Sequence, residues 1–160
     1  MYEFQTQPQK VEYHEGESFK LHKDLNLFHN KMRIRKLITG VQNLFKERLG
    51  IPLDAPAIRD TYFKAEYTNK SFILLCSELD KERELNQIFE KYIVHNLNPG
   101  GFEIEVSNEY IFLRAPDESG FEKGIKILTS ILNQTLNKYF KEKQFEEHIE
   151  IPMLSILDGI

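Results

Sequence analysis

Alternating apolar and polar positions predict short strands near the start of the chain. Residues 10–14 and 18–21 alternate in this way, which is the period of a half-buried strand. The intervening Glu-Gly-Glu at residues 15–17 supplies a turn, because glycine accepts a positive φ at little cost. We therefore expect a β-hairpin over residues 10–21, followed by a third short strand over residues 25–28.

A different pattern begins at Asn30, where apolar residues recur every three or four positions and predict an amphipathic helix. Asn30 can cap its start, Gly50 is a natural residue just beyond its end, and Pro52 prevents its continuation. The apolar stripe consists of Ile34, Leu37, Ile38, Val41, Leu44, Phe45 and Leu49. We expect this stripe to face the core.

A short apolar run in the middle of the chain predicts a central strand. Residues 71–76 are too few for a helix of usual length, and such a run is typical of a strand buried on both faces. Cys76 ends the run, and we interpret it as a small buried hydrophobic residue, since no cationic neighbour in the sequence activates it. Residues 77–96 then predict a helix, which the Asn-Pro-Gly-Gly sequence at 98–101 ends.

The next region predicts a second hairpin and a long helix. Residues 102–107 alternate, residues 107–109 turn the chain, and residues 110–113 return as a strand. Phe102, Ile104 and Val106 point to one side of the first strand, and Glu103, Glu105 and Ser107 point to the other. After a loop, the buried face of an amphipathic helix consists of Phe121, Ile125, Leu128, Leu132, Leu136 and Tyr139.

The final alternation, over residues 147–154, predicts one last strand. The chain stops at Ile160 soon after this strand, so we expect that something normally follows. A length of 160 residues with 41% apolar and 29% charged residues is typical of one globular domain. We therefore expect a single α+β domain over residues 1–160.

The charge and hydropathy of the chain argue against two kinds of partner. The formal net charge is -4, so the chain lacks the cationic surplus that nucleic acid requires. The densest basic run, residues 31–36, interleaves its charges with apolar residues, as on the solvated side of a helix. No apolar stretch approaches the roughly 20 residues that cross a bilayer. Residues 1–10 do not form a signal peptide, so we expect a cytoplasmic protein, although a piece cut from a secreted precursor would look the same.

Several segments in the correct order carry a family resemblance. Residues 101–106 (GFEIEV), 111–115 (IFLRA) and 120–128 (GFEKGIKIL) resemble the N-terminal domain of β-N-acetylhexosaminidases and O-GlcNAc hydrolases. Residues 8–21 are similar to the opening of that domain, and residues 49–51 are similar to the end of its first helix. The sequence departs from the family at Glu122 and Lys123, where aromatic residues are common, at Ile127, where threonine is usual, and at the junction motif, of which Asp158 is the only hint.

The resemblance implies a mixed β-sheet with helices packed on one face, joined to a (β/α)8 barrel that carries the active site. It also implies a substrate-assisted mechanism, in which the acetamido oxygen attacks the anomeric carbon beside an acidic pair in the barrel. The chain lacks that barrel, so we expect a non-catalytic domain whose partner is the barrel in cis or a carbohydrate. The alternatives are a free-standing carbohydrate- or protein-binding module and a small enzyme of unrecognised type, which would need a deep polar pocket.

The carboxylates of the chain do not form a pattern typical of catalysis. Asp117-Glu118 and the pair at residues 146–147 lack the apolar flanks that raise a catalytic pKa, so we interpret both as solvated turns. The glycines in Gly120-x-x-x-Gly124 are not followed by the Lys-Ser/Thr of a phosphate loop. We expect them to allow close packing at the start of a helix.

The histidines and the aromatic residues in loosely patterned segments do not form a recognisable site either. The histidines lack the spacing of a zinc site; they are His14, His22, His29, His95 and His148. Four aromatic residues could stack on sugars but are better explained by core packing; they are Phe4, Tyr62, Phe63 and Tyr67. The sequence therefore predicts no catalytic residue, no metal ligand and no cofactor, and it assigns no binding residue.

Overall fold

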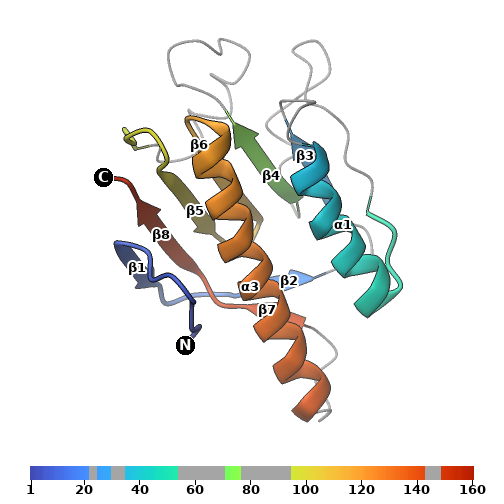
Figure 1. Cartoon of the computed structure of the whole chain (residues 1–160). Coiled ribbons are helices and arrows are strands. Elements are labelled where there is room, and N and C mark those ends of the chain that lie inside the picture. Colours follow the sequence, from blue (N-terminus) through green and yellow to red (C-terminus); the bar gives the residue numbers. More distant parts are fainter. Residues whose placement is uncertain (22–24, 30–34, 54–70, 77–94, 143–148) are drawn as a thin grey trace.

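The computed structural model describes residues 1–21, 25–29, 35–53, 71–76, 95–142 and 149–160. A six-stranded sheet lies behind two helices that run side by side across one of its faces (Figure 1). A separate sheet of two strands lies below it. The elements are β1 (Lys10–Tyr13), β2 (Phe19–Leu21), β3 (Asn26–His29), α1 (Arg35–Leu49), β4 (Ser71–Cys76), β5 (Phe102–Val106), β6 (Tyr110–Ala115), α3 (Glu118–Glu142), β7 (Ile149–Ile151) and β8 (Leu154–Asp158). The expected fold class, an α+β domain with a mixed sheet and helices on one face, is confirmed.

The large sheet has the strand order β1-β8-β5-β6-β4-β3 and is mixed in direction. Strands β3, β4 and β6 are parallel neighbours, whereas β5, β8 and β1 pair antiparallel with the strands beside them. The predicted central strand is confirmed as β4, which lies between two partners. Its residues Phe72, Ile73 and Leu74 are all buried, as expected of a strand covered on both faces.

The core lies between the large sheet and the two helices. The stripe predicted on the first helix is buried at Ile38, Val41 and Phe45, and the Phe45 ring meets the Phe72 ring edge-on at a centroid distance of 5.6 Å. Helix α1 ends as predicted, with Gly50 at a positive φ of 66°. Residues 30–34 of the predicted helix, and residues 77–94 of the next one, lie outside the described residues.

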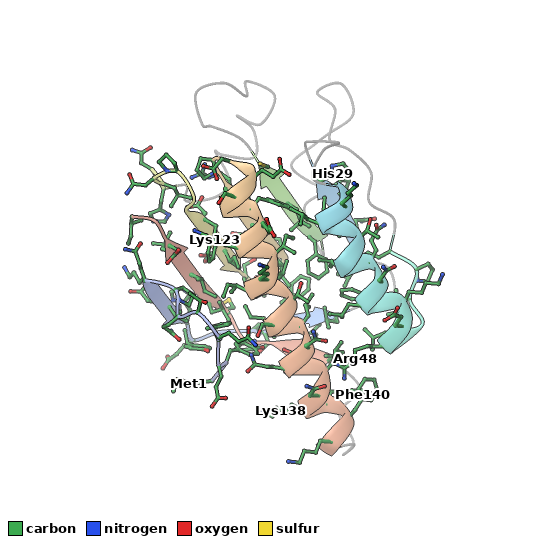
Figure 2. The ribbon with its side chains drawn as sticks, in the orientation of Figure 1. Met1, His29, Arg48, Lys123, Lys138 and Phe140 are labelled. Carbon is green, nitrogen blue, oxygen red and sulfur yellow. The ribbon has the colours of Figure 1, made fainter. Side chains whose placement is uncertain are left out.

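The two helices are also joined through polar side chains near their C-terminal ends (Figure 2). Arg48 of α1 donates hydrogen bonds to the side-chain oxygens of Asn133 and Asn137 on α3, at 3.1 and 2.8 Å. Its guanidinium group also lies 5.7 Å from the centre of the Phe140 ring. Among the described residues, neither helix is long and apolar enough to cross a bilayer.

The glycines that precede and open α3 allow the helix to approach the sheet closely. A Cβ atom on Gly120 would lie 2.0 Å from the carbonyl oxygen of Gly101. One on Gly124 would lie 2.5 Å from Cδ1 of Leu113 and 3.3 Å from Phe102. The expectation that these glycines serve close packing is confirmed.

The predicted hairpin over residues 10–21 is wrong, although both of its strands exist. Strand β1 pairs with β8 in the large sheet, and β2 pairs with β7 in the small one. Alternation identifies a strand but not its partner, and the partners here come from the other end of the chain. The second predicted hairpin is confirmed, since β5 and β6 pair antiparallel around the turn at residues 107–109.

The single final strand predicted over residues 147–154 is also wrong in extent. Strands β7 and β8 belong to different sheets, and Pro152 and Met153 separate them. Proline has no N–H to donate to a ladder, which favours a break at this point. Strand β8 continues to Asp158 between β1 and β5, so residues 154–158 form an interior strand of the sheet.

Candidate functional site

A buried ion pair lies on the sheet face opposite the helices. Glu103 on β5 and Arg114 on β6 are directly opposite each other in the ladder, and Nε of Arg114 lies 3.1 Å from Oε1 of Glu103. Their exposed fractions are 3% and 1%. The other carboxylate oxygen, Oε2, accepts the backbone N–H of His95 at 3.0 Å and lies 2.9 Å from its ring Nδ1. Glu103 is therefore held by a guanidinium group and by His95, which suits a structural ion pair.

A second carboxylate, Glu105, lies two residues further along β5 on the same face. Burial raises the pKa of this carboxyl, and a hydrogen bond donated by the Ser155 hydroxyl opposes part of that rise. The Ser155 oxygen also lies 2.7 Å from Nε2 of His14. Because Ser155 gives its only proton to Glu105, His14 must donate to the serine oxygen. A nucleophilic serine needs the reverse arrangement, in which histidine accepts the proton.

The candidate catalytic carboxylates of the sequence have structural roles or lie outside the described residues. Asp117 accepts the backbone N–H groups of Gly120 and Gly100, at 2.8 and 2.9 Å, and so joins the start of α3 to the turn before β5. Glu118 is exposed at the first residue of α3. Residues 146–147 are not among the described residues.

The histidines are dispersed rather than gathered at one site. His95 contacts Glu103, His14 contacts Ser155 beside Glu105, and His29 is buried in β3. His22 and His148 lie outside the described residues. Within the described ranges, no three His, Cys, Asp or Glu side chains are placed to hold a metal ion. The expectations of no metal and no catalytic residue stay predictions for the whole chain.

The N-terminal arm, residues 1–9, packs along α3 and was not expected to do so. Gln134 of α3 accepts the backbone N–H of Glu3 at 2.9 Å and donates to its carbonyl oxygen at 2.6 Å. The hydroxyl of Tyr2 lies 2.7 Å from that of Thr135. Phe4 packs against the core, as the sequence predicted, whereas Tyr62, Phe63 and Tyr67 are not described. Residues of the arm and of α3 together line two grooves.

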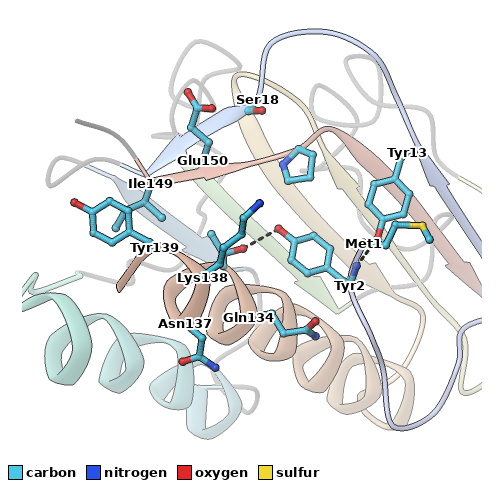
Figure 3. Close-up of a pocket in the computed structure, with 12 residues that line it drawn as sticks. Met1, Tyr2, Tyr13, Ser18, Gln134, Asn137, Lys138, Tyr139, Ile149 and Glu150 are labelled. Carbon is cyan, nitrogen blue, oxygen red and sulfur yellow. Dashed lines mark hydrogen bonds between the residues drawn. The ribbon is translucent and has the colours of Figure 1, made fainter. Parts of the chain in front are cut away.

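The first groove, here called the tyrosine groove, has a volume of about 590 Å³. Tyr2 and Tyr13 lie at one end and Tyr139 at the other, with Lys138 between them (Figure 3). Glu150 and Ser18 reach the groove from the side of the small sheet. Burial raises the pKa of the Tyr2 phenol, with Thr135 opposing part of the rise, so this hydroxyl stays protonated.

The second groove, here called the exit groove, has a volume of about 640 Å³, and residues 3–8 of the arm line part of it. Its apolar lining includes Phe4, Phe102 and Ile125, and Lys123 and Lys126 also line it. Asp158, the last residue of β8, belongs to the same lining. The groove is therefore next to the point at which the chain leaves the sheet.

The end of the chain is held in place beside the exit groove. The side-chain oxygen of Gln9 accepts the backbone N–H groups of Gly159 and Ile160, at 2.5 and 2.9 Å. The Gly159 carbonyl accepts the N–H of Asn98 at 2.7 Å, and a Cβ atom on Gly159 would lie 2.5 Å from Cα of Gly101. The positive φ of 78° at Gly159 also favours glycine.

Known proteins and protein families with the same fold were found by comparison. A family model described as glycosyl hydrolase family 20, domain 2, matches residues 7–159. The solved structure of CpGH84D is similar with a TM-score of 0.68 and 19% identity, over 99% of this chain and 24% of that one. No curated protein matches the sequence.

Two solved enzymes named for family 20 or for β-N-acetylhexosaminidase activity are also similar. The GH20 exo-β-N-acetylglucosaminidase from Vibrio harveyi, in complex with N-acetylglucosamine, gives a TM-score of 0.57 at 14% identity, over 95% of this chain and 18% of that one. The β-N-acetylhexosaminidase from Bacteroides fragilis NCTC 9343 gives 0.56 at 16% identity, over 96% and 24%. These likenesses show the fold, and the chain spans at most 24% of the length of the three structures.

Proposed function

Because the chain belongs to glycosyl hydrolase family 20, domain 2, we propose that it supports a C-terminal (β/α)8 barrel in a hexosaminidase-like glycoside hydrolase. Domain 2 is the non-catalytic accessory domain of these enzymes, so the chain alone does not contain the catalytic barrel. The barrel partner, and the hydrolysis of N-acetylhexosaminides by the whole protein, belong to the proposal. The substrate-assisted chemistry would reside in the barrel.

The observation that carries this proposal is the position of the exit groove. Gln9 and Asn98 fix the backbone of Gly159, so any residues after Ile160 start from a defined place. That place adjoins a largely apolar groove of about 640 Å³ between the N-terminal arm and α3. A domain that follows Ile160 and buries this groove would gain hydrophobic contact. Its docking would cost less conformational entropy, because the chain that leads to it is already held in place at Gly159.

The test begins with the native reading frame and continues with the whole protein. We expect a barrel-sized extension that contains an adjacent acidic pair. In that full-length protein, Thr129→Arg places a long charged side chain in the exit groove, because Thr129 lines it and is half-buried. We expect this change to lower the unfolding temperature of the barrel and to leave the isolated 160-residue domain unchanged.

A matched control inserts arginine far from the exit groove. Asn108 is exposed in the β5–β6 turn, at the end of β5 opposite to Phe102 and Asp158. Asn108→Arg should leave both the barrel and the isolated domain unaffected. A reading frame that ends without a barrel would refute the proposal, and equal effects of the two arginine variants on the barrel would refute the docking site.

A further inference from the structure

The tyrosine groove combines aromatic surface with exposed polar side chains. The rings of Tyr2 and Tyr13 are nearly parallel, at 23°, with their centres 6.4 Å apart. Tyr13 is 38% exposed, which makes it one of the few large hydrophobic side chains among the described residues that face solvent to this extent. Its hydroxyl accepts the backbone N–H of Tyr2 at 2.8 Å, so the ring is held in place.

The polar lining of the groove comes from two different elements. Lys138 projects from α3, and Glu150 projects from β7 on the opposite side (Figure 3). Both residues are exposed, and they supply donors on one side of the groove and acceptors on the other. Pockets that recognise small molecules have this composition, with an apolar and aromatic lining and a few placed polar groups.

The charge balance of the groove indicates what kind of ligand fits. Lys138 and Glu150 are the only charged side chains in its described lining, so the side chains of the lining balance in charge. A phosphate or nucleotide would meet the carboxylate of Glu150, and a cation would meet the amine of Lys138. A neutral ligand rich in hydroxyl groups can use both groups as hydrogen-bond partners.

A pyranose matches the remaining features, because one face of the ring presents C–H groups and its edge presents hydroxyl groups. The C–H face can pack on a tyrosine ring, whose faces carry negative partial charge. The aromatic residues lie at both ends of the groove, and its volume of about 590 Å³ is within the usual range for small-molecule sites. The groove therefore has room for more than one sugar unit.

We propose that the tyrosine groove binds a neutral pyranose oligosaccharide, which packs on Tyr13 and Tyr139 and forms hydrogen bonds with Lys138 and Glu150. The accessory domain would then hold a sugar chain at a second place, in addition to any site in a barrel. The proposal concerns only residues of this chain and does not depend on the presence of a barrel. Either proposal can fail without the other.

The experiment titrates the isotope-labelled 160-residue chain with triacetylchitotriose and, separately, with maltotriose, and follows the backbone amides by NMR. We expect saturable shifts at Tyr13, Lys138, Tyr139 and Glu150, with dissociation constants of about 1 mM. Tyr13→Ala should weaken binding at least about tenfold, which corresponds to about 1.4 kcal/mol. Tyr13→Phe keeps the ring and should bind within a few-fold of the unmodified chain.

Lysine variants provide the matched control. Lys138→Ala should weaken binding, whereas Lys46→Ala should not, since Lys46 is exposed on α1 and does not line the groove. Thermal unfolding of each variant confirms that it is folded before binding is compared. The proposal is overturned if neither trisaccharide shifts the groove residues, if Tyr13→Ala binds as tightly as the unmodified chain, or if inorganic phosphate shifts the same residues more strongly.

Discussion

Arg114 lies directly opposite Glu103 in the β5–β6 ladder, and the two form an ion pair that is almost completely shielded from water. Removing two charges from water is costly, and the attraction between them offsets that cost only while both are present. Each residue also contacts His95, through its backbone or its ring. The pair therefore fixes the register of two central strands.

Arg114→Ala should destabilise the domain by about 3–5 kcal/mol, because Glu103 then stays buried without its guanidinium partner. The measurement is the free energy of unfolding in urea. The double variant Glu103→Leu with Arg114→Met should recover most of the loss, since it leaves no buried charge. A single variant as stable as the unmodified chain would contradict this account.

The exposed ion pair of Lys10 and Glu12 is the matched control for that measurement. Its two side chains are 51% and 52% exposed, with a distance of 3.1 Å between Nζ and Oε1. Water screens such a pair and side-chain entropy opposes it, so Lys10→Ala should change the stability by less than about 1 kcal/mol. The difference between the stability losses of Arg114→Ala and Lys10→Ala isolates the effect of burial.

Gly120→Ala should destabilise the domain by about 2 kcal/mol, in the range found for overpacked sites. The added methyl group would overlap the carbonyl oxygen of Gly101, and a backbone atom cannot move aside as a side chain can. Gly40→Ala is the control, because Gly40 lies inside α1 and a Cβ there meets no atom within 4 Å. It should instead stabilise the domain by about 0.5–1 kcal/mol. Denaturant unfolding of the two variants, with effects of opposite sign, checks this prediction.

Local patterns in the sequence predicted most strands and helices but could not predict how the N-terminal strands pair. The alternation at residues 10–13 and 19–21 is real, yet the partners of these strands lie near residue 150. A pattern of period two records which side chains face the core and contains no information on distant partners. Sequence proximity favoured a hairpin, and the tertiary structure favours two different sheets.

The polar side chains of β5 show a second limit of the pattern. Alternation correctly placed Glu103 and Glu105 on the face opposite Phe102 and Ile104, but it did not predict that Glu103 is buried. The available signal was Arg114, a charged residue inside the otherwise apolar stretch of β6, which requires a buried partner. The tyrosine groove had no comparable signal, because Tyr2 lies in an arm without any periodicity.

The pH dependence of stability should report on Glu105. Burial raises the pKa of this carboxyl above its ordinary value of 4.5, so the folded protein binds the proton more tightly than the unfolded chain does. The resulting stabilisation is complete at pH values below 4.5 and is lost as the pH rises through the raised pKa. Glu105→Gln stays neutral, so its stability relative to the unmodified chain should be greater at pH 7 than at pH 4.

Ser155→Ala is the companion variant for that experiment. The Ser155 hydroxyl donates to the Glu105 carboxylate and favours its charged form, so its removal should raise the pKa further. Urea unfolding across this pH range should then show a larger loss of stability with rising pH than in the unmodified chain. An identical pH profile for all three proteins would show that Glu105 does not titrate differently in the folded state.

Gln9 should control the mobility of the last residues without controlling the fold. Its side-chain oxygen is the acceptor for the N–H groups of Gly159 and Ile160, and both bonds are exposed. Gln9→Ala should therefore speed amide hydrogen exchange at these two residues by about tenfold and lower the global stability by no more than about 1 kcal/mol. Gln5→Ala, an exposed change in the same arm, should leave their exchange unaltered. If Gln9→Ala left the exchange of both amides unchanged, the arm would not fix the exit of the chain, and a following domain would be positioned by its own contacts alone.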